Sequence, residues 1–263
     1  MVPNIAHVIF GLSPDFGGKP FSLAHYLAIE SLRQVNRPER IYLYYRYEPS
    51  GEWWERCLPH VALVRFDPPQ SIGGQVLLHP AHQADVARLQ ILYELGGIYL
   101  DLDTICVRSF QPLLDTDCVL GIEIADGHLM GLCNAVILAA PRSTFIKRWL
   151  DGFDPATSRW RGFRSAGRDL HWNEYSVRYP AFLAHWYPGE VTIEGPRSFY
   201  SPSWSEEGLR KLFVLPPDTD DSDAYCHHLW ESFSWDRYLR DLTRGSIMAG
   251  EDMYSRLAKG FLP

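Results

Sequence analysis

The chain has 263 residues and a hydrophobic content of 46%, which is sufficient for one sizeable globular core. Its formal net charge is -7 and it contains no basic run, so a nucleic-acid partner is not expected. Five scattered cysteines without a C-x-x-C pair argue against a disulfide framework or a structural zinc site, and they favour a cytoplasmic location.

The N-terminal segment lacks the basic start and the long apolar run of a signal peptide. No window of the sequence approaches the roughly eighteen consecutive apolar residues that a transmembrane helix needs. We therefore expect neither a targeting segment nor a membrane span. Peripheral contact with the inner face of a membrane remains open.

The first half of the chain alternates between apolar strands and amphipathic helices. In chain order, the sequence predicts a strand at 7–12, a helix at 20–35, strands at 40–45 and 61–66, a helix at 80–95, strands at 97–103, 118–124 and 134–140, and a helix at 142–153. Such alternation predicts an α/β fold, with helices flanking a mostly parallel, Rossmann-like sheet.

The pattern loosens in the second half of the chain. Residues 157–169 are basic, aromatic and irregular, and residues 191–204 indicate a strand, a Gly-Pro turn and an aromatic loop. The tail at 235–262 has a helical pattern with expected breaks near Gly245 and Gly250. This half therefore predicts an irregular α+β region.

The helix predicted at 80–95 carries two charges in an unusual place. Leu92 and Leu95 lie on its core-facing stripe, and Asp85 and Arg88 fall within the same stripe. A buried charge costs several kcal/mol unless it has a partner. Either the two residues form a local ion pair, or the helix borders a polar cleft where they bind ligand hydroxyls and a carboxylate or phosphate.

Asp101 and Asp103 follow the next apolar strand, one residue apart. On a strand they would share a face, opposite Leu100 and Leu102. Neighbouring carboxylates repel unless a cation lies between them, and Mg²⁺ and Mn²⁺ prefer carboxylate and phosphate oxygens. The pair therefore predicts a metal that bridges to a diphosphate. The alternative is two aspartates that cap turns at a strand end.

The segment ADVARLQILYELGGIYLDLDT, residues 84–104, resembles the signature of the DXD-motif sugar transferases. That family includes the fungal initiating mannosyltransferase, the vertebrate α-1,4-galactosyltransferase and the clostridial glucosylating toxins. Its pattern, S-D-x-x-R-x-x-x-L-x-x-x-G-G-x-Y-x-D-x-D, is met except at Ala84, where serine is usual. Weaker similarity extends to HVIFG, LCNAVILAAPRSTFIKRWL and YCHHLWESFSW, whereas residues 155–220 match nothing in the family pattern.

The resemblance implies a GT-A fold and a metal-dependent glycosyltransferase that moves a hexose from a nucleotide sugar with retention of configuration. A UDP-sugar and Mn²⁺ are favoured, with GDP-mannose and Mg²⁺ as alternatives. The acceptor would be a glycan, a lipid-linked molecule or a small molecule. We expect a single domain, 1–263, with a donor half at 1–140 and an acceptor and lid half at 141–263.

The resemblance also implies roles for the signature residues. Asp103 would be the principal metal ligand, and Asp101 would contact the ribose, the sugar, or the metal and its water. Asp85 would bind donor-sugar hydroxyls, and Arg88 would orient the sugar or the phosphates. The expected catalytic residues are Asp85, Arg88, Asp101 and Asp103.

Further donor contacts are expected outside these four residues. Tyr99 and the backbone near Leu100 would flank the nucleotide, and Phe10 belongs to the opening strand that lies under the base in the family. Asn134 would contact the donor sugar, or is a turn residue before a strand. These residues and the catalytic group form the expected nucleotide-sugar site.

His227 and His228 lie on a predicted strand and should therefore face opposite sides. We expect His228 to be a third metal ligand, and the alternative is a histidine pair without a metal role. Trp230 and Trp235 would either pack on the nucleotide, sugar or metal loop, or fill the core.

No residue stands out as a covalent nucleophile. The available carboxylates are Glu123, Asp126 and Glu174, and each is predicted to lie on the surface or in a loop. Two other functions share parts of this pattern. An aspartyl phosphatase of the haloacid dehalogenase type also has a D-x-D after a strand, but normally on the first strand and with a different following residue. A non-catalytic carbohydrate- or nucleotide-binding protein with the same fold is the other.

Overall fold

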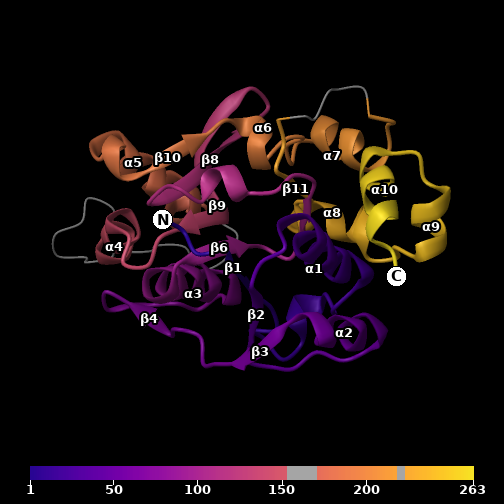
Figure 1. Ribbon diagram of the computed structural model, residues 1–263, viewed down its shortest axis with the longest axis horizontal. Helices are drawn as coiled ribbons and strands as arrows, with labels where there is room; N and C mark the ends of the chain where they lie inside the picture. The colour runs from indigo at the N-terminus through magenta and orange to yellow at the C-terminus, as the bar shows by residue number, and fades with distance from the viewer. Residues whose placement is uncertain (153–170, 218–222) are drawn as a thin grey trace.

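A computed structural model describes residues 1–152, 171–217 and 223–263. Within these residues, seven strands form a central sheet in the order β10–β8–β9–β6–β1–β2–β3 (Figure 1). Their bounds are β1 (Ile5–Ile9), β2 (Arg40–Tyr45), β3 (Ala62–Arg65), β6 (Gly97–Leu100), β8 (Cys118–Ala125), β9 (His128–Ala139) and β10 (Thr192–Glu194). Only β9 runs antiparallel to its neighbours β6 and β8, so the described sheet is mostly parallel, as predicted.

Helices cover both faces of this sheet. Their bounds are α1 (Leu23–Asn36), α2 (Glu52–Cys57), α3 (Pro80–Leu95), α4 (Thr144–Asp151), α5 (Tyr179–Trp186), α6 (Pro196–Phe199), α7 (Glu206–Phe213), α8 (Glu231–Ser234), α9 (Arg244–Ala249) and α10 (Met253–Ala258). None of the helices in the described ranges combines the length and apolar character needed to cross a lipid bilayer.

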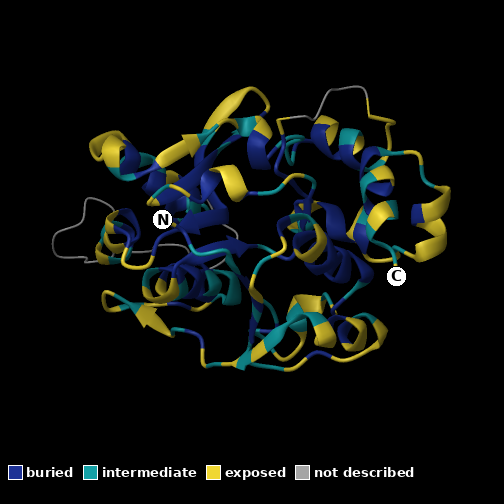
Figure 2. Cartoon of the chain, viewed as in Figure 1, coloured by how far each residue is buried: buried dark blue, intermediate teal, exposed yellow. Residues whose placement is uncertain are grey.

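The side chains of β6 alternate between two apolar clusters. Ile98 and Leu100 belong to the cluster that includes α1, whereas Tyr99 belongs to the cluster that includes α3. Successive residues of a strand point to opposite faces, so the two clusters are the cores on the two faces of the sheet. Figure 2 shows the central strands as the buried interior of the molecule.

A two-stranded ribbon connects segments that are far apart in the sequence. Strand β7 (Thr104–Cys106) pairs antiparallel with β11 (Cys226–His228), and Thr104 lies opposite His228. The ribbon brings the C-terminal part of the chain to the end of β6. A separate small hairpin consists of β4 (Ser71–Ile72) and β5 (Gln75–Val76).

Two glycines make the turn from α3 into β6 possible. Gly96 and Gly97 have φ angles of 65° and 111°, which L side chains rarely adopt. A Cβ atom at Gly96 would lie 2.5 Å from Pro141 Cδ, and one at Gly97 would lie 2.6 Å from the Ile5 carbonyl oxygen. The chain can therefore end the helix and enter the crowded centre of the sheet within two residues.

The structure corrects two details around the signature segment and confirms a third. The strand predicted to reach residue 103 ends at Leu100, because a turn begins at Asp101, whose carbonyl accepts a 2.9 Å hydrogen bond from the Thr104 hydroxyl. Leu95 was predicted in the core but is 47% exposed, because the last turn of α3 extends beyond its apolar cluster. The bounds of α3 agree with the predicted helix at 80–95.

The second half is more helical than predicted. Helix α6 occupies part of the predicted aromatic loop, and α5 and α7 lie where no helix was expected. In the tail, the helical pattern is interrupted at 240–243 and at Gly250, as expected near Gly245 and Gly250, and Gly245 itself lies inside α9, which starts at a capping box on Thr243. The basic segment at 157–169 lies outside the described residues.

Candidate active site

A pocket of about 560 Å³ opens beside the residues that follow β1 and β6, and both halves of the chain line it. This is the expected place for a ligand in an open α/β sheet. The predicted site residues that line it are Phe10, Asp85, Arg88, Tyr99, Asp101, Asp103, Asn134, His228 and Trp230. Leu100 does not line it, and its side chain lies in the core.

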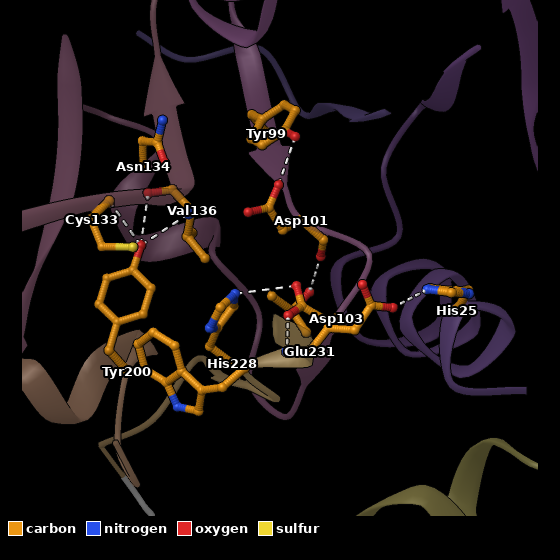
Figure 3. A network of polar contacts seen from close by, with 12 residues as sticks. His25, Tyr99, Asp101, Asp103, Cys133, Asn134, Val136, Tyr200, His228 and Glu231 are labelled. Atoms are coloured by element: carbon orange, nitrogen blue, oxygen red, sulfur yellow. Dashed lines mark hydrogen bonds and ion pairs between the residues drawn. The ribbon is translucent and has the colours of Figure 1, made fainter. Parts of the chain in front are cut away.

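Three groups that can bind a metal converge in this pocket. One ligand atom from each of Asp101, Asp103 and His228 lies within 4.8 Å of the other two. The aspartates come from the turn after β6, and His228 comes from β11 (Figure 3). As expected for neighbours on a strand, His227 points elsewhere, and its Nδ1 lies 2.6 Å from the Ser201 carbonyl oxygen.

The imidazole of His228 is both an ion-pair partner of Asp103 and a candidate metal ligand. Its Nε2 lies 3.2 Å from Asp103 Oδ1, yet neither ring nitrogen makes a well-aligned hydrogen bond with any described residue. Burial opposes the charge on both groups, but their mutual attraction holds the pKa of Asp103 well below its usual range and raises the pKa of His228. Two carboxylates and one imidazole suit Mn²⁺ better than Mg²⁺.

Arg88 links the helix to the other polar groups of the site. Its Nη1 donates to the Asn134 carbonyl at 2.8 Å and to Asp101 Oδ2 at 3.2 Å, and its Nη2 lies 3.5 Å from Asp85. The guanidinium carbon also lies 4.5 Å from the ring centroid of Tyr99. The local ion pair therefore exists and borders a polar pocket, and the ligand contacts of Asp85 and Arg88 stay a prediction.

The two carboxylates beside Arg88 are held by neutral donors as well. Asp85 accepts a 2.8 Å hydrogen bond from the Asn134 side-chain amide, and Asp101 accepts one of 2.7 Å from the Tyr99 hydroxyl. Burial raises the pKa of Asp85 to about 6, although Arg88 and Asn134 oppose the shift. Burial raises the pKa of Asp101 too. Each carboxylate therefore has a fixed orientation at the pocket wall.

A bulge in β9 aims Asn134 into the pocket. The pairing of β8 with β9 jumps between Leu120 and Gly121, leaving three extra residues on β9. The buried Tyr200 hydroxyl satisfies the irregular backbone: it accepts from the Val136 N–H at 2.9 Å and donates to the Cys133 carbonyl at 3.0 Å (Figure 3). The bulge is thus stabilised by hydrogen bonds with a buried side chain and is a defined part of the site.

The segment after β11 covers the metal-binding candidates. Trp230 has a left-handed backbone, with φ 56°, and its ring packs edge-on against His228 with centroids 4.2 Å apart. The next residue, Glu231, donates its N–H to Asp103 at 2.7 Å, and its carboxylate lies 2.7 Å from His25 of α1. Trp235 is buried outside the pocket lining and belongs to the core.

Sequence reasoning placed one lining residue incorrectly and missed several others, among them two aromatic residues. Glu123 is predicted on the surface or in a loop, but it is 5% exposed and lines the pocket; the available signal is the nearly continuous apolar run of β8, which indicates a strand buried on both faces. Trp204 and Phe233 also line the pocket, and their sequence context gave no sign of it. Glu174 is likewise buried, whereas Asp126 is exposed as predicted.

The sequence of the chain matches a protein family and a curated relative. Residues 63–120 match the family described as "Glycosyltransferase sugar-binding region containing DXD motif". The whole chain is 34% identical to Glucan organizing enzyme 1 of Cryptococcus neoformans var. grubii, and the match covers 71% of that protein.

Two solved structures share the fold at low sequence identity. Mouse xyloside xylosyltransferase 1 is 13% identical with a TM-score of 0.52, over 89% of this chain and 99% of that chain. The glycosyltransferase GlyE of Streptococcus pneumoniae is 14% identical with a TM-score of 0.51, over 98% of this chain and 60% of that chain. The phosphatase alternative is therefore wrong. The chain belongs to the DXD-motif glycosyltransferase family and is a glycosyltransferase with a GT-A fold.

Proposed function

We propose that the protein is a metal-dependent, retaining glycosyltransferase that moves a hexose from a nucleotide sugar to a glycan, lipid-linked or small-molecule acceptor. A UDP-sugar is favoured over GDP-mannose. The observation that carries the proposal is the convergence of Asp101, Asp103 and His228 within 4.8 Å at a pocket of about 560 Å³. Bound Mn²⁺, or Mg²⁺ as the alternative, would act as a Lewis acid toward the leaving diphosphate.

In this proposal the three converging residues hold the cation. Asp103 and His228 are direct ligands, and Asp101 binds the cation or its water while Tyr99 and Arg88 keep the carboxylate oriented. A hydrogen-bond network that fixes a ligand typically raises metal affinity, because less freedom is lost on binding. This role for Arg88 differs from a direct contact with phosphate, since its donors already face protein oxygens.

The donor would occupy the wall formed by residues from the first half of the chain. Asp85 would accept hydrogen bonds from the hydroxyls of the donor sugar, and the Asn134 side-chain amide would donate to them. The base would lie near Phe10, whose ring stacks on Phe16 with centroids 5.7 Å apart at the pocket wall. Lining residues on both sides of position 140 support the division into a donor half, 1–140, and an acceptor and lid half, 141–263.

The retaining outcome rests on the resemblance to the family. A cytoplasmic location, with peripheral contact at the inner membrane face, is also part of the proposal. Its support is that all five cysteines are buried free thiols, as is usual for proteins of a reducing compartment. Fractionation of cells that express the tagged protein tests the location, and recovery only in a secreted fraction would contradict it.

A panel of nucleotide sugars tests the activity. UDP-glucose, UDP-galactose, UDP-N-acetylglucosamine and GDP-mannose are incubated with the protein in Mn²⁺, Mg²⁺ or EDTA, and release of nucleoside diphosphate is measured. We expect turnover of a UDP-sugar in Mn²⁺ and none in EDTA. Asp103→Ala should be inactive, whereas Asp126→Ala, a matched change at an exposed carboxylate, should be normal. Full turnover after complete metal removal would overturn the proposal.

Asp85→Asn separates a sugar-binding role from a purely structural one. The change is nearly isosteric and removes only the charge. If Asp85 holds the donor sugar, turnover should fall by orders of magnitude while UDP still binds. If Asp85 only pairs with Arg88, turnover should survive and the free energy of unfolding should fall. A destabilised but kinetically normal variant would therefore remove Asp85 from the donor site.

A further inference from the structure

One wall of the pocket is not used by the proposed donor contacts. It consists of Glu123 on β8, Trp204 before α7, and Phe233 on α8, and all three residues line the pocket. Trp204 Nε1 donates a 2.9 Å hydrogen bond to Glu123 Oε1. The Trp204 ring stacks on Phe233, with centroids 5.2 Å apart and planes at 14°. We call these three residues the Glu123 wall.

The Glu123 wall runs from solvent to the interior. Phe233 is 51% exposed, whereas Glu123 is 5% exposed. The indole of Trp204 lies between them, because it stacks on the first residue and hydrogen-bonds to the second. A ligand that enters along these rings would therefore meet a buried carboxylate at the inner end.

The charge of Glu123 decides what kind of ligand fits. In the described part of the chain no ion pair includes Glu123, and the Trp204 indole is the side-chain donor that hydrogen-bonds to it. An ionised carboxylate has about four acceptor sites and is costly to bury with few donors. It also repels phosphate groups. A neutral ligand rich in hydroxyl groups suits this position, and a diphosphate does not.

The aromatic part of the wall points to the same chemistry. Rings of Trp and Phe offer flat apolar faces, and one face of a pyranose exposes mainly C–H groups that such a ring can cover. Pockets that combine aromatic walls with a few fixed polar groups are typical of specific small-ligand sites. An aromatic surface that ends at a carboxylate thus offers both an apolar face and a hydroxyl acceptor.

The wall also lies close to the proposed donor sugar. Glu123 is on β8, where Gly121 pairs with Cys133 of β9, the residue directly before Asn134. The residues between His228 and Phe233 connect the metal-binding candidates to the aromatic part of the wall. Both placements put the wall beside the reacting centre rather than at a remote surface.

We propose that the Glu123 wall is the subsite for a neutral pyranose of the acceptor. The apolar face of the sugar packs on the aromatic rings, and one of its hydroxyls donates a hydrogen bond to Glu123. This inference rests on the proposed function, because an acceptor subsite has a role only beside a bound donor.

Binding of simple sugars tests the inference directly. Methyl α- and β-pyranosides of glucose, galactose and mannose are titrated into the full chain, with and without Mn²⁺ and UDP, and binding is followed by saturation-transfer NMR. The variants are Glu123→Gln and Phe233→Ala. Trp186→Ala is the matched control, because this tryptophan is 61% exposed at the end of α5 and does not line the pocket.

We expect at least one pyranoside to bind the wild type. Phe233→Ala should weaken that binding by about two- to tenfold, the usual effect of losing one aromatic contact. Glu123→Gln should raise the KM for an acceptor sugar by about tenfold, since it loses a charged acceptor. Both variants should still bind Mn²⁺ and UDP together, and Trp186→Ala should match the wild type in every measurement. The exposed position of Phe233 keeps the test valid if Glu123→Gln does not fold.

The outcomes separate this inference from the proposed function. Equal pyranoside binding by the wild type and Phe233→Ala, or no binding to the wild type at tens of millimolar sugar, overturns the subsite. A third outcome is pyranoside binding that depends on the wall, in a protein that does not bind Mn²⁺ and UDP. This outcome supports the subsite and contradicts the proposed function.

The source of the acceptor sugar is a separate arm of the experiment. Transfer to an octyl pyranoside in micelles but not to the methyl pyranoside indicates a lipid-linked acceptor, and transfer to both indicates a soluble glycan. Dependence of either transfer on Phe233 supports the subsite, and independence overturns it.

Discussion

Replacement of Arg88 by methionine tests the charge network of the site. The guanidinium lies 3.5 Å from Asp85 and 3.2 Å from Asp101, and it donates a 2.8 Å hydrogen bond to the Asn134 carbonyl. Methionine keeps most of the aliphatic stem and adapts to irregular space, but it leaves both carboxylates without their cation. The variant therefore isolates the electrostatic contribution of Arg88.

Protonation limits the size of the effect. The pKa of Asp85 is already raised to about 6, so at pH 7 a further rise costs at most about 1.4 kcal/mol before the carboxyl simply takes up a proton. The side chain of Asp101 is 29% exposed, and screening by water limits the free energy that this carboxylate loses to about the same size as that of Asp85. Loss of the hydrogen bond to Asn134 adds about 1 kcal/mol. We expect Arg88→Met to lower the free energy of unfolding by about 3 kcal/mol at pH 7.

The pH dependence has a definite sign. Without Arg88 the folded-state pKa of each carboxyl is higher still, so the folded variant binds more protons than the folded wild type just below pH 7. Acidification therefore stabilises the variant relative to the wild type. We expect the difference in the free energy of unfolding between wild type and variant to narrow by about 1 to 2 kcal/mol between pH 7 and pH 5, measured by urea denaturation at both pH values.

A matched arginine provides the control. Arg142 pairs with Glu94 on the surface, and both side chains are more than half exposed, so Arg142→Met should cost about 1 kcal/mol or less at either pH. A loss of less than about 1 kcal/mol for Arg88→Met at pH 7, or a difference that grows toward pH 5, would refute the reasoning.

Three further predictions concern the scaffold of the site. Burial lowers the pKa of His7 to about 4, so protonation of the unfolded chain should cost the wild type about 3 kcal/mol of stability between pH 6.5 and 4. Urea denaturation should find this loss absent in His7→Gln, and an equal loss in the variant would contradict the prediction. Tyr200→Phe leaves the buried Val136 N–H and Cys133 carbonyl without their partner and should lower the free energy of unfolding by about 1 to 3 kcal/mol; an unchanged urea midpoint would count against the bulge account. In Gly97→Ala the alanine must adopt φ 111° with its Cβ 2.6 Å from a carbonyl oxygen, so thermal melting should show a loss of more than about 2 kcal/mol in the free energy of unfolding. A variant as stable as the wild type would show that this position does not require glycine.

The donor side of the site could be predicted because its residues are close together in the sequence. Helix periodicity, the glycine pair and the D-x-D spacing all fall within residues 80–103, and α3 has the predicted bounds. The strand was predicted too long because the alternation of Leu100, Asp101 and Leu102 fits a strand as well as a turn. The hydrogen bond from the Thr104 hydroxyl to the Asp101 carbonyl is part of the turn, and the alternation does not reveal it.

The other side of the pocket could not be predicted because it depends on contacts across the chain. Trp204 meets Glu123 across 81 positions, and its indole donates a hydrogen bond to the buried carboxylate. The bulge that turns Asn134 toward the pocket depends on the Tyr200 hydroxyl, which lies on a different element. Periodicity describes which face of one element is apolar, and it does not contain these tertiary partners.

Direct measurement of Mn²⁺ binding tests the central claim most closely. The chain is titrated with Mn²⁺ in the presence of UDP, and free Mn²⁺ is followed by electron paramagnetic resonance. The account predicts that Asp103→Asn and His228→Ala each weaken Mn²⁺ binding by about tenfold or more, whereas Asp126→Ala binds like the wild type. Equal Mn²⁺ affinity in the wild type and both ligand variants, each shown to be folded, would contradict it.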